Sequence, residues 1–331
     1  MSFYQRDLLN HFRELQPVLL RLGAEAFLDP CAFVLRLRSG GITRVLYPQF
    51  MAFTDGARRY TMNFNSDAVR FIGWCPYVNR RWPLASEKLL FKGFAVQNGI
   101  RTPDYSVDPS AAMEDVVVKR SMSSFGVSIK GPFRSSSEHS LDAGAGEYFE
   151  RFVPGRIAKI WYWNDQPVCL ELERMPVVKG NGVSTIREVV GRRLFQRGRR
   201  MVFESLAPFL KYQGLTLDTV LERGKEQIVE FRYGSPLLVP DLASEVNLIS
   251  NMIPYLESPM RDIGRKLWGA IPQHARPNTV FTVDAIVDEE NRLWTLEMNS
   301  NPAIHPYVYP VMLESLFAAK KETVAVAGVA S

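Results

Sequence analysis

The segment FTVDAIVDEENRLWTLEMNSNP, residues 281–302, is the part of the chain that most constrains its fold. Apolar and polar residues alternate on both sides of the polar stretch DEEN, which is the pattern of two strands joined by a turn. Because residues two apart on a strand point to the same face, Glu297 and Asn299 are neighbours, and Asp284 on the first strand can join them. The sequence therefore predicts a hairpin with three oxygen-bearing side chains on one face.

These three side chains are candidate ligands for a magnesium ion. Carboxylate and amide oxygens are ligands that Mg²⁺ prefers, and nucleotide phosphates and water usually complete its coordination. Mn²⁺ is the alternative ion. The competing interpretation is a solvent-facing polar edge without a ligand. The apolar residues Leu293, Trp294, Leu296 and Met298 argue against that interpretation, because they indicate a buried hairpin in which a carboxylate requires a partner.

Helical and strand patterns interleave along the rest of the chain without a strict repeat, which predicts a mixed sheet in an α/β or α+β protein. Residues 55–85 have a weak periodic signal and are expected to be a loop-bearing end of the first domain, and 147–155 fit either a helix or a strand. The expected helices are 7–27 and 86–100. The expected strands are 31–38, 43–50, 115–121, two within 157–176, 227–234, 279–288 and 293–299.

The formal net charge of +5 favours an anionic ligand, and the densest basic run is GRRLFQRGRR at 191–200. A solvated helix face is the first interpretation of this run, and a site for a phosphorylated or acidic substrate is the second. Nucleic acid comes third, because no aromatic-interleaved binding motif accompanies the run. The chain has no apolar stretch that could span a membrane and no signal-peptide pattern, so we expect a cytoplasmic protein with no membrane partner.

A nucleotide site also requires cations and backbone donors for the phosphates. The common phosphate loops, GxxxxGK[ST] and a GxGxxG that follows a strand, do not occur in the sequence. The segment VVVKRSMSSFGVSI (116–129) instead places Lys119 at the end of an apolar strand and a Ser/Gly loop directly after it. Taken alone, a surface lysine before a hairpin turn is the more ordinary interpretation of this segment.

Five motifs together resemble the ATP-grasp superfamily of ATP-dependent carboxylate–amine ligases, especially its D-alanine–D-alanine ligase and cyanophycin-synthetase-like branches. The motifs occur in the family's order, and the resemblance covers residues 85 to 315. They are KLLFKGFAVQNGIRTP, VVVKRSMSSFG, YFERFVPGR, LERMPVVKGNGVSTIREVV and VDAIVDEENRLWTLEMNSNP.

The resemblance implies an ATP-grasp fold, in which two α+β subdomains clasp ATP, and it implies ATP and Mg²⁺ as cofactors. The implied parts are a small N-terminal α/β domain at 1–85, a central subdomain with the phosphate loop at 86–154, and a C-terminal subdomain with the metal hairpin at 155–331.

The implied ATP contacts are Lys88, Lys119, Ser121, Ser123, Ser124, Gly126, Glu150, Arg151 and Val153, and the implied metal ligands are Asp284, Glu297 and Asn299. Lys92 is an alternative to Lys88, and both lysines could simply be solvated. Glu150 could instead pair with Arg151 or Arg156.

Arg174 is expected to stabilise the transferring γ-phosphoryl group, although Glu171 or Glu173 could pair with it structurally. Arg232 is a candidate for a second catalytic arginine that contacts phosphate or substrate.

One position departs from the family pattern. Many relatives carry an acid for the ribose hydroxyls seven residues after the hinge glutamate, and here that position is Ile157. Either another residue, such as Lys159 or Asp165, contacts the ribose, or nucleotide binding is altered.

The implied activity is ATP-dependent formation of an amide or peptide bond between an amino-acid-like carboxylate and an amine, through an acyl phosphate and with release of ADP and phosphate. The expected partners are small-molecule amino acids or peptides, and a homodimer is left open. Three alternatives remain: a ligase that modifies a peptide or protein chain, a kinase that phosphorylates a hydroxyl, and a noncatalytic basic binding module. His305, Tyr307 and Tyr309 are candidate substrate contacts, although aromatic packing is the better interpretation for the tyrosines.

Overall fold

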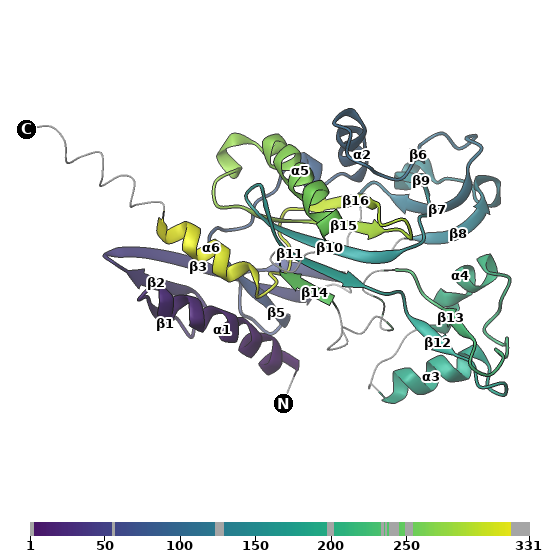
Figure 1. The fold of residues 1–331 in the computed structure, drawn as a ribbon, viewed down its shortest axis with the longest axis horizontal. Helices are drawn as coiled ribbons and strands as arrows, with labels where there is room; N and C mark the ends of the chain where they lie inside the picture. The colour runs from purple at the N-terminus through teal and green to yellow at the C-terminus, as the bar shows by residue number, and fades with distance from the viewer. Residues whose placement is uncertain are drawn as a thin grey trace, which may run out of the picture.

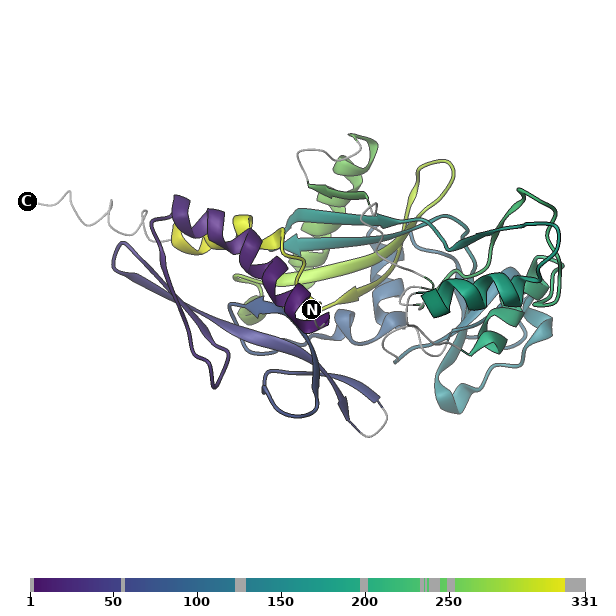
Figure 2. The same cartoon turned by 90° about the horizontal axis from the view of Figure 1, so that it is seen from below.

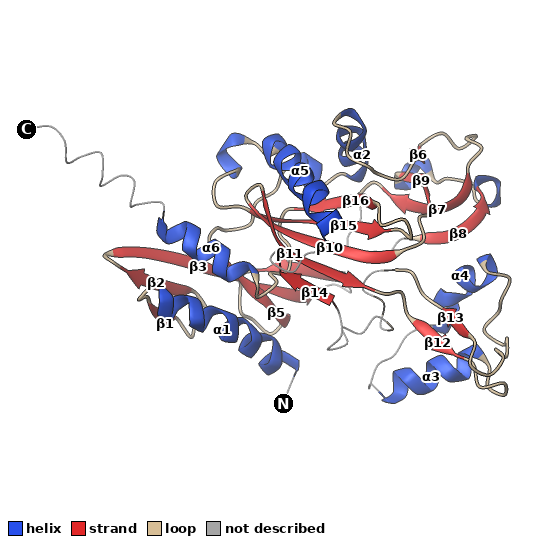
Figure 3. Ribbon diagram, in the orientation of Figure 1, coloured by secondary structure: helices blue, strands red, loops and turns tan. Residues whose placement is uncertain are grey.

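Helices packed against antiparallel sheets make up the computed structural model of this protein (Figure 3). The structure describes residues 3–54, 57–122, 129–196, 202–232, 235, 237, 245–248 and 254–318. The antiparallel sheets confirm the α+β form of the expected fold class. None of the helices in those ranges combines the length and apolar character of a bilayer-crossing segment.

The central sheet carries the predicted hairpin at one edge (Figure 1). Its strands, in spatial order, are β14 (Glu245–Leu248), β11 (Gln166–Glu173), β10 (Arg156–Trp163), β15 (Val280–Val287) and β16 (Leu293–Asn299). Alternate residues of β10 and β15, such as Ile160 and Val283, face a core shared with α5 (Pro254–Ala270). The remaining residues of these strands point to the opposite face, because side chains alternate along a strand.

A second sheet lies beside the β15–β16 edge. Its strands, in spatial order, are β6 (Tyr105–Ser106), β9 (Glu147–Arg151), β7 (Glu114–Arg120) and β8 (Lys130–Ser135). Helix α2 (Lys88–Gln97) connects this sheet to the central one. The buried residues Phe91 and Ala95 of α2 pack into the core of the central sheet, and the Lys88 backbone N–H donates to the carbonyl of Ser121 at the end of β7.

The N-terminal part of the chain forms a sheet covered by helices from both ends of the described chain. The strand order is β1 (Glu25–Leu28), β2 (Leu35–Ser39), β3 (Ile42–Thr54) and β4 (Ala57–Thr61), with β5 (Ala68–Cys75) also paired to β3. Helices α1 (Phe3–Arg21) and α6 (Val308–Ala318) lie side by side, as Figures 1 and 2 both show. Tyr309 is buried and contacts His11 Nδ1 at 2.8 Å, which agrees with the packing interpretation of this tyrosine.

A small lobe lies at the end of the molecule opposite α1 and α6 (Figure 1). It contains α3 (Ile186–Gln196), α4 (Ala207–Tyr212) and the paired strands β12 (Val177–Lys179) and β13 (Glu226–Ile228). Part of the basic run at 191–200 lies on α3, and residues 197–200 are outside the described residues. Arg192 donates to Ser184 Oγ and Arg193 to the carbonyl of Val177. These two arginines are therefore hydrogen-bonded within their own lobe.

Short 3-10 helices complete the described structure. They are η1 (Pro83–Ala85), η2 (Ser136–Glu138), η3 (Ala143–Ala145), η4 (Phe203–Leu206) and η6 (Gln273–Ala275).

Three of the expected boundaries are wrong. Residues 55–85 contain β4 and β5, and the segment expected to be one helix at 7–27 ends at Arg21 and continues into β1. The last five residues of β5 are all buried, so this strand lacks the alternation that identifies a strand from sequence. The strand expected at 227–234 ends at Ile228. The division into three domains stays a prediction.

Candidate functional site

Four charged residues form a row across one face of the central sheet. The strand register pairs Glu171 of β11 with Lys159 of β10, Lys159 with Asp284 of β15, and Asp284 with Glu297 of β16. Directly paired residues of antiparallel strands point to the same face. This row therefore lies opposite the face that packs against α5, and the predicted metal hairpin supplies half of it.

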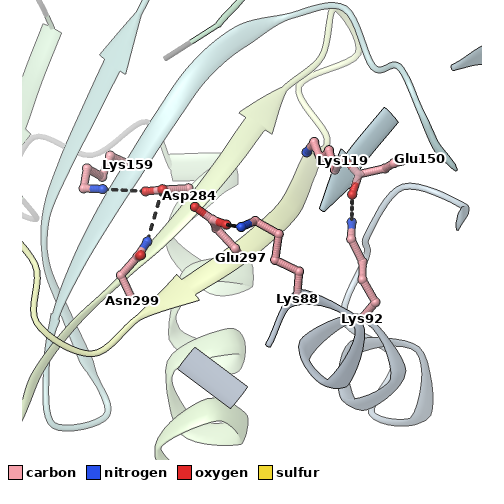
Figure 4. Close-up of polar contacts among 8 residues, drawn as sticks. All are labelled: Lys88, Lys92, Lys119, Glu150, Lys159, Asp284, Glu297 and Asn299. Carbon is pink, nitrogen blue, oxygen red and sulfur yellow. Dashed lines mark hydrogen bonds and ion pairs between the residues drawn. The ribbon is translucent and has the colours of Figure 1, made fainter. Parts of the chain in front are cut away.

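Each carboxylate of the hairpin is held by a lysine (Figure 4). Lys159 Nζ lies 2.6 Å from Asp284 Oδ1, and Lys88 Nζ lies 3.0 Å from Glu297 Oε2. Asn299 Nδ2 donates to Asp284 Oδ2 at 3.2 Å. The structure thus brings together all three predicted metal ligands and the first predicted phosphate lysine.

The environment of Glu297 opposes its negative charge. Burial raises the pKa of this carboxyl above its usual value, the neighbouring negative charge of Asp284 raises it further, and Lys88 acts against both. Two carboxylates this close in a partly dehydrated site repel each other unless cations accompany them. The site is therefore suited to receive positive charge.

A second group of charges is buried beside the first (Figure 4). Glu150 of β9 accepts from Lys119 Nζ at 2.5 Å and lies 2.7 Å from Lys92 Nζ. Lys92 also donates to Thr102 Oγ1 at 2.6 Å. Helix α2 supplies one lysine to each group, because Lys88 and Lys92 are one helical turn apart. Lys92 and Glu150 are shielded from solvent, so the solvated interpretation is wrong for Lys92, and Glu150 pairs with neither Arg151 nor Arg156.

Burial and charge act in opposite directions on this second group. Burial lowers the pKa of Lys92 to about 8, although Glu150 acts to raise it. Burial also acts to raise the pKa of Glu150, but the two lysines hold that pKa below its usual value. Because two cations share one carboxylate, this group carries a net positive charge, which favours binding of an anion such as a phosphate.

An apolar cluster lies on the same face of the central sheet as the charged row. It contains Ile157 and Ile286, with Val153, Trp294 and Leu296 packed against them. Val153, one of the predicted ATP contacts, thus lies beside an apolar surface. Of the two suggested ribose contacts, Lys159 binds Asp284. Asp165 lies beyond the far end of β10, and that end is about 20 Å along the strand from Ile157.

The remaining predicted site residues are less closely tied to the row. Arg174 is exposed and follows β11 directly. Arg151 is also exposed, and its Nη1 lies 3.8 Å from Asp104 Oδ2. Ser121 links β7 to α2 through its backbone carbonyl, and its own side chain lies close to Gly146. Ser123, Ser124 and Gly126 fall outside the described residues.

Arg232 has the contacts of a structural residue. Its guanidinium binds both carboxylate oxygens of Glu230, at 2.8 and 3.0 Å, and it also donates to the carbonyl of Ser205. Glu230 is buried, so this pair ties the chain after β13 to the small lobe. A catalytic role for Arg232 stays a prediction.

The donor set of the hairpin fits magnesium. Within the described ranges, no group of three or more His, Cys, Asp or Glu residues is placed so that it could hold a metal ion by itself. Asp284 and Glu297 supply carboxylates, and Asn299 can supply only an amide oxygen. Mg²⁺ commonly binds to one or two carboxylates and takes its other ligands from substrate phosphates and water. These residues therefore suit an ion that arrives with a nucleotide.

No family model matches the chain, and no curated protein matches it in sequence. Several solved structures are similar in fold. A bifunctional glutathione synthetase from Pasteurella multocida has 16% identity and a TM-score of 0.44, with 93% of this chain and 43% of that chain covered. The D-alanine–D-alanine ligase of Bacillus anthracis, complexed with ATP, has 13% identity and a TM-score of 0.33, with 72% and 68% covered.

The ATP-grasp ligase PsnB, complexed with a minimal precursor, has 11% identity and a TM-score of 0.33, with 70% of this chain and 60% of that chain covered. These three neighbours are ligases and synthetases. This chain spans less than half the length of the glutathione synthetase.

Sequence reasoning missed three features of the site. It treated Lys159 only as a ribose candidate, whereas Lys159 binds the predicted metal ligand Asp284. It considered Glu171 only as a partner for Arg174, and it offered Lys92 only as a substitute for Lys88. The strand pattern shows that Lys159 and Glu171 alternate with buried residues, but their partners depend on the register between strands.

Proposed function

We propose that this protein is an ATP-dependent ligase of the ATP-grasp type, which joins an amino-acid-like carboxylate to an amine through an acyl phosphate. The observation that carries the proposal is the pairing of Asp284 with Lys159 and of Glu297 with Lys88. Oxygen ligands for a cation and ammonium groups for phosphates are thereby gathered on one face of the central sheet, with Lys88 supplied by α2.

In this proposal, binding of ATP exchanges the partners of these side chains. Lys88 and Lys159 pass from the carboxylates to phosphate oxygens, while Asp284, Glu297 and Asn299 are left to hold Mg²⁺. When bound, Mg²⁺ supplies charge neutralisation to the transferring phosphoryl group. The lysines contribute in the same way, because positioned positive charges stabilise negative charge that is shared among the phosphoryl oxygens.

The second charged group and the apolar cluster accommodate the rest of the nucleotide. Lys119 donates to a phosphate, and Glu150 accepts from the amino group of the base. The base packs against the cluster that includes Ile157, Ile286 and Trp294. This arrangement is supported by the positive charge around Glu150 and by the apolar cluster on the same face as the charged row.

The chemistry consists of two displacements. First, a carboxylate oxygen attacks the γ-phosphorus, the bond from that phosphorus to the β,γ-bridging oxygen breaks, and ADP leaves. The amine nitrogen then attacks the acyl carbon, the bond to the phosphate oxygen breaks, and phosphate and a proton are released. Neither step requires a nucleophilic serine or cysteine, so orientation and charge neutralisation by the site residues suffice.

A screen of ATP consumption tests the proposal. The protein would be incubated with ATP, Mg²⁺ and a panel of amino acids and short peptides, and both the nucleotide and the coupled product would be identified. We expect ADP together with an amide. AMP with pyrophosphate contradicts the proposal, and a stable phosphoester would identify a kinase instead.

Variants test the assigned residues. Glu297→Gln and Lys119→Ala are each expected to remove turnover while the protein stays folded. Glu290→Gln is the matched control, because Glu290 lies on the exposed turn of the same hairpin and pairs with Arg292. It should retain turnover. Retained turnover in Glu297→Gln or Lys119→Ala refutes the role given to that residue.

A further inference from the structure

Glu171 is the member of the charged row that has no cation of its own. Lys159 pairs with Asp284, and Lys88 pairs with Glu297. Among the described residues, the side chain of Glu171 forms neither a hydrogen bond nor an ion pair, although its backbone is paired within the sheet. It nevertheless points to the same face as these residues, because it is the cross-strand partner of Lys159.

The surroundings of Glu171 disfavour an unpaired negative charge. Burial, together with the negative charges of Glu173 and Asp284, raises the pKa of this carboxyl to about 7, while Lys159 and Arg70 act in the opposite direction. Arg70 belongs to β5, so Glu171 lies where the N-terminal sheet approaches the central sheet. A carboxylate in such a place gains most from a partner that brings a positive charge.

We propose that Glu171 binds the ammonium group of the amine substrate, and that this substrate is therefore a primary amine that arrives as a cation. The inference rests on the proposed function. The spacing of the strands supports it: the backbone of Glu171 is about 5 Å from that of Lys159 and about 10 Å from that of Asp284. An amine held there is next to the phosphate-binding lysine and within reach of an acyl group activated at the hairpin.

A different role for Glu171 would be to form an ion pair with Lys159 when Asp284 binds a metal ion instead of this lysine. The two roles make different demands. An ammonium site affects the amine and not the nucleotide, whereas a resting place for Lys159 affects Mg²⁺ and ATP. A test must therefore compare amines that differ in charge and must also measure nucleotide binding.

Hydroxylamine is the neutral probe, because it is mostly uncharged at neutral pH and traps acyl phosphates as hydroxamates. Each variant would be assayed with the full chain, ATP and Mg²⁺ at pH 7.5, once with hydroxylamine and once with the amino-acid panel as amines. The measured quantity is the ratio of amide formation to hydroxamate formation. This ratio cancels any effect that a substitution has on activation of the carboxylate.

Glu171→Gln is expected to lower this ratio at least tenfold, mainly through a higher KM for the cationic amine, and to leave the affinity for Mg²⁺ and ATP within about twofold. Glu173→Gln is the matched control, since Glu173 is on the same face of β11 and pairs with Ile157. It should leave the ratio unchanged.

Three results would overturn the inference. The first is an unchanged ratio in Glu171→Gln, and the second is an equal fall in Glu173→Gln. The third is a tenfold loss of Mg²⁺ and ATP affinity in Glu171→Gln without a change in the ratio. That result would show that Glu171 pairs with Lys159 and does not bind the amine. If the wild-type protein forms no hydroxamate with any carboxylate, the proposed function itself fails and the inference fails with it.

Discussion

Lys92 Nζ lies 2.7 Å from Glu150 Oε2, and both side chains are almost fully buried, at 0% and 2% exposed. Lys119 approaches the other oxygen of the same carboxylate. A buried ion pair does not necessarily add stability, because both charges lose their hydration, but removal of one partner leaves the other uncompensated. Glu150 is therefore the only counter-charge that Lys92 and Lys119 contact among the described residues.

Replacement of Glu150 should therefore cost more than replacement of Lys92. We expect Glu150→Gln to lower the free energy of unfolding by about 3 kcal/mol, because two buried lysines lose their counter-charge. Lys92→Met should change it by less than about 1 kcal/mol, since Glu150 keeps Lys119 and methionine fills the volume. Urea denaturation of both variants measures the difference. An equal loss in the two variants would show that the two lysines do not share the Glu150 carboxylate.

A third carboxylate in the hairpin should make stability depend on magnesium. Asn299→Asp removes the hydrogen bond to Asp284 Oδ2 and places another negative charge beside it. Without Mg²⁺, the melting temperature should fall by several degrees because of this repulsion, and Mg²⁺ should raise it more than in the wild type.

Asn65→Asp is the control for this experiment, because Asn65 is exposed and its side-chain oxygen accepts from the Asp67 backbone N–H, which aspartate can replace. It should show the wild-type response to Mg²⁺. If Asn299→Asp shows the same response to Mg²⁺ as this control, the hairpin is not the ion site.

The raised pKa of Glu171 predicts a pH dependence of stability. A carboxyl with a pKa of about 7 when folded and 4.5 when unfolded binds more protons in the folded state between these values. Its contribution to stability is therefore complete below pH 4.5 and is lost as the pH rises to 7. Relative to wild type, Glu171→Gln should gain about 2–3 kcal/mol over this range. Urea midpoints at pH 4.5 and 7.5 provide the measurement, and equal differences at the two pH values would contradict the prediction.

The turn between β9 and β10 should not tolerate a side chain at Gly155. A Cβ there would lie 2.4 Å from the carbonyl oxygen of Val287 and 2.7 Å from the Ile286 side chain. We expect Gly155→Ala to cost about 2 kcal/mol, because backbone as well as side chain must move. Gly93→Ala is the control: a Cβ there meets nothing within 4 Å, and alanine favours its helix. If both variants are equally stable, the turn is looser than its geometry indicates.

Local patterns in the sequence were sufficient to identify the hairpin that carries the predicted metal ligands. The alternation at 281–302 identified β15 and β16 and placed Glu297 and Asn299 on one face, because the side-chain period of a strand is two. The same reasoning identified β10, β11 and β7. It failed for β5, whose C-terminal half is buried on both faces, and for β1, a short strand whose residues are all exposed.

The identity of each ion pair was decided by the tertiary structure. Lys88 and Lys92 lie on the same side of α2, and the sequence offered no way to choose between them. The position of α2 between two sheets assigns Lys88 to Glu297 and Lys92 to Glu150. In the same way, Lys159 meets Asp284 only because β10 pairs with β15 in one register. The Lys88–Glu297 contact joins residues 209 positions apart in the chain. Local periodicity therefore determines the face on which a side chain lies, and only global packing determines its partner.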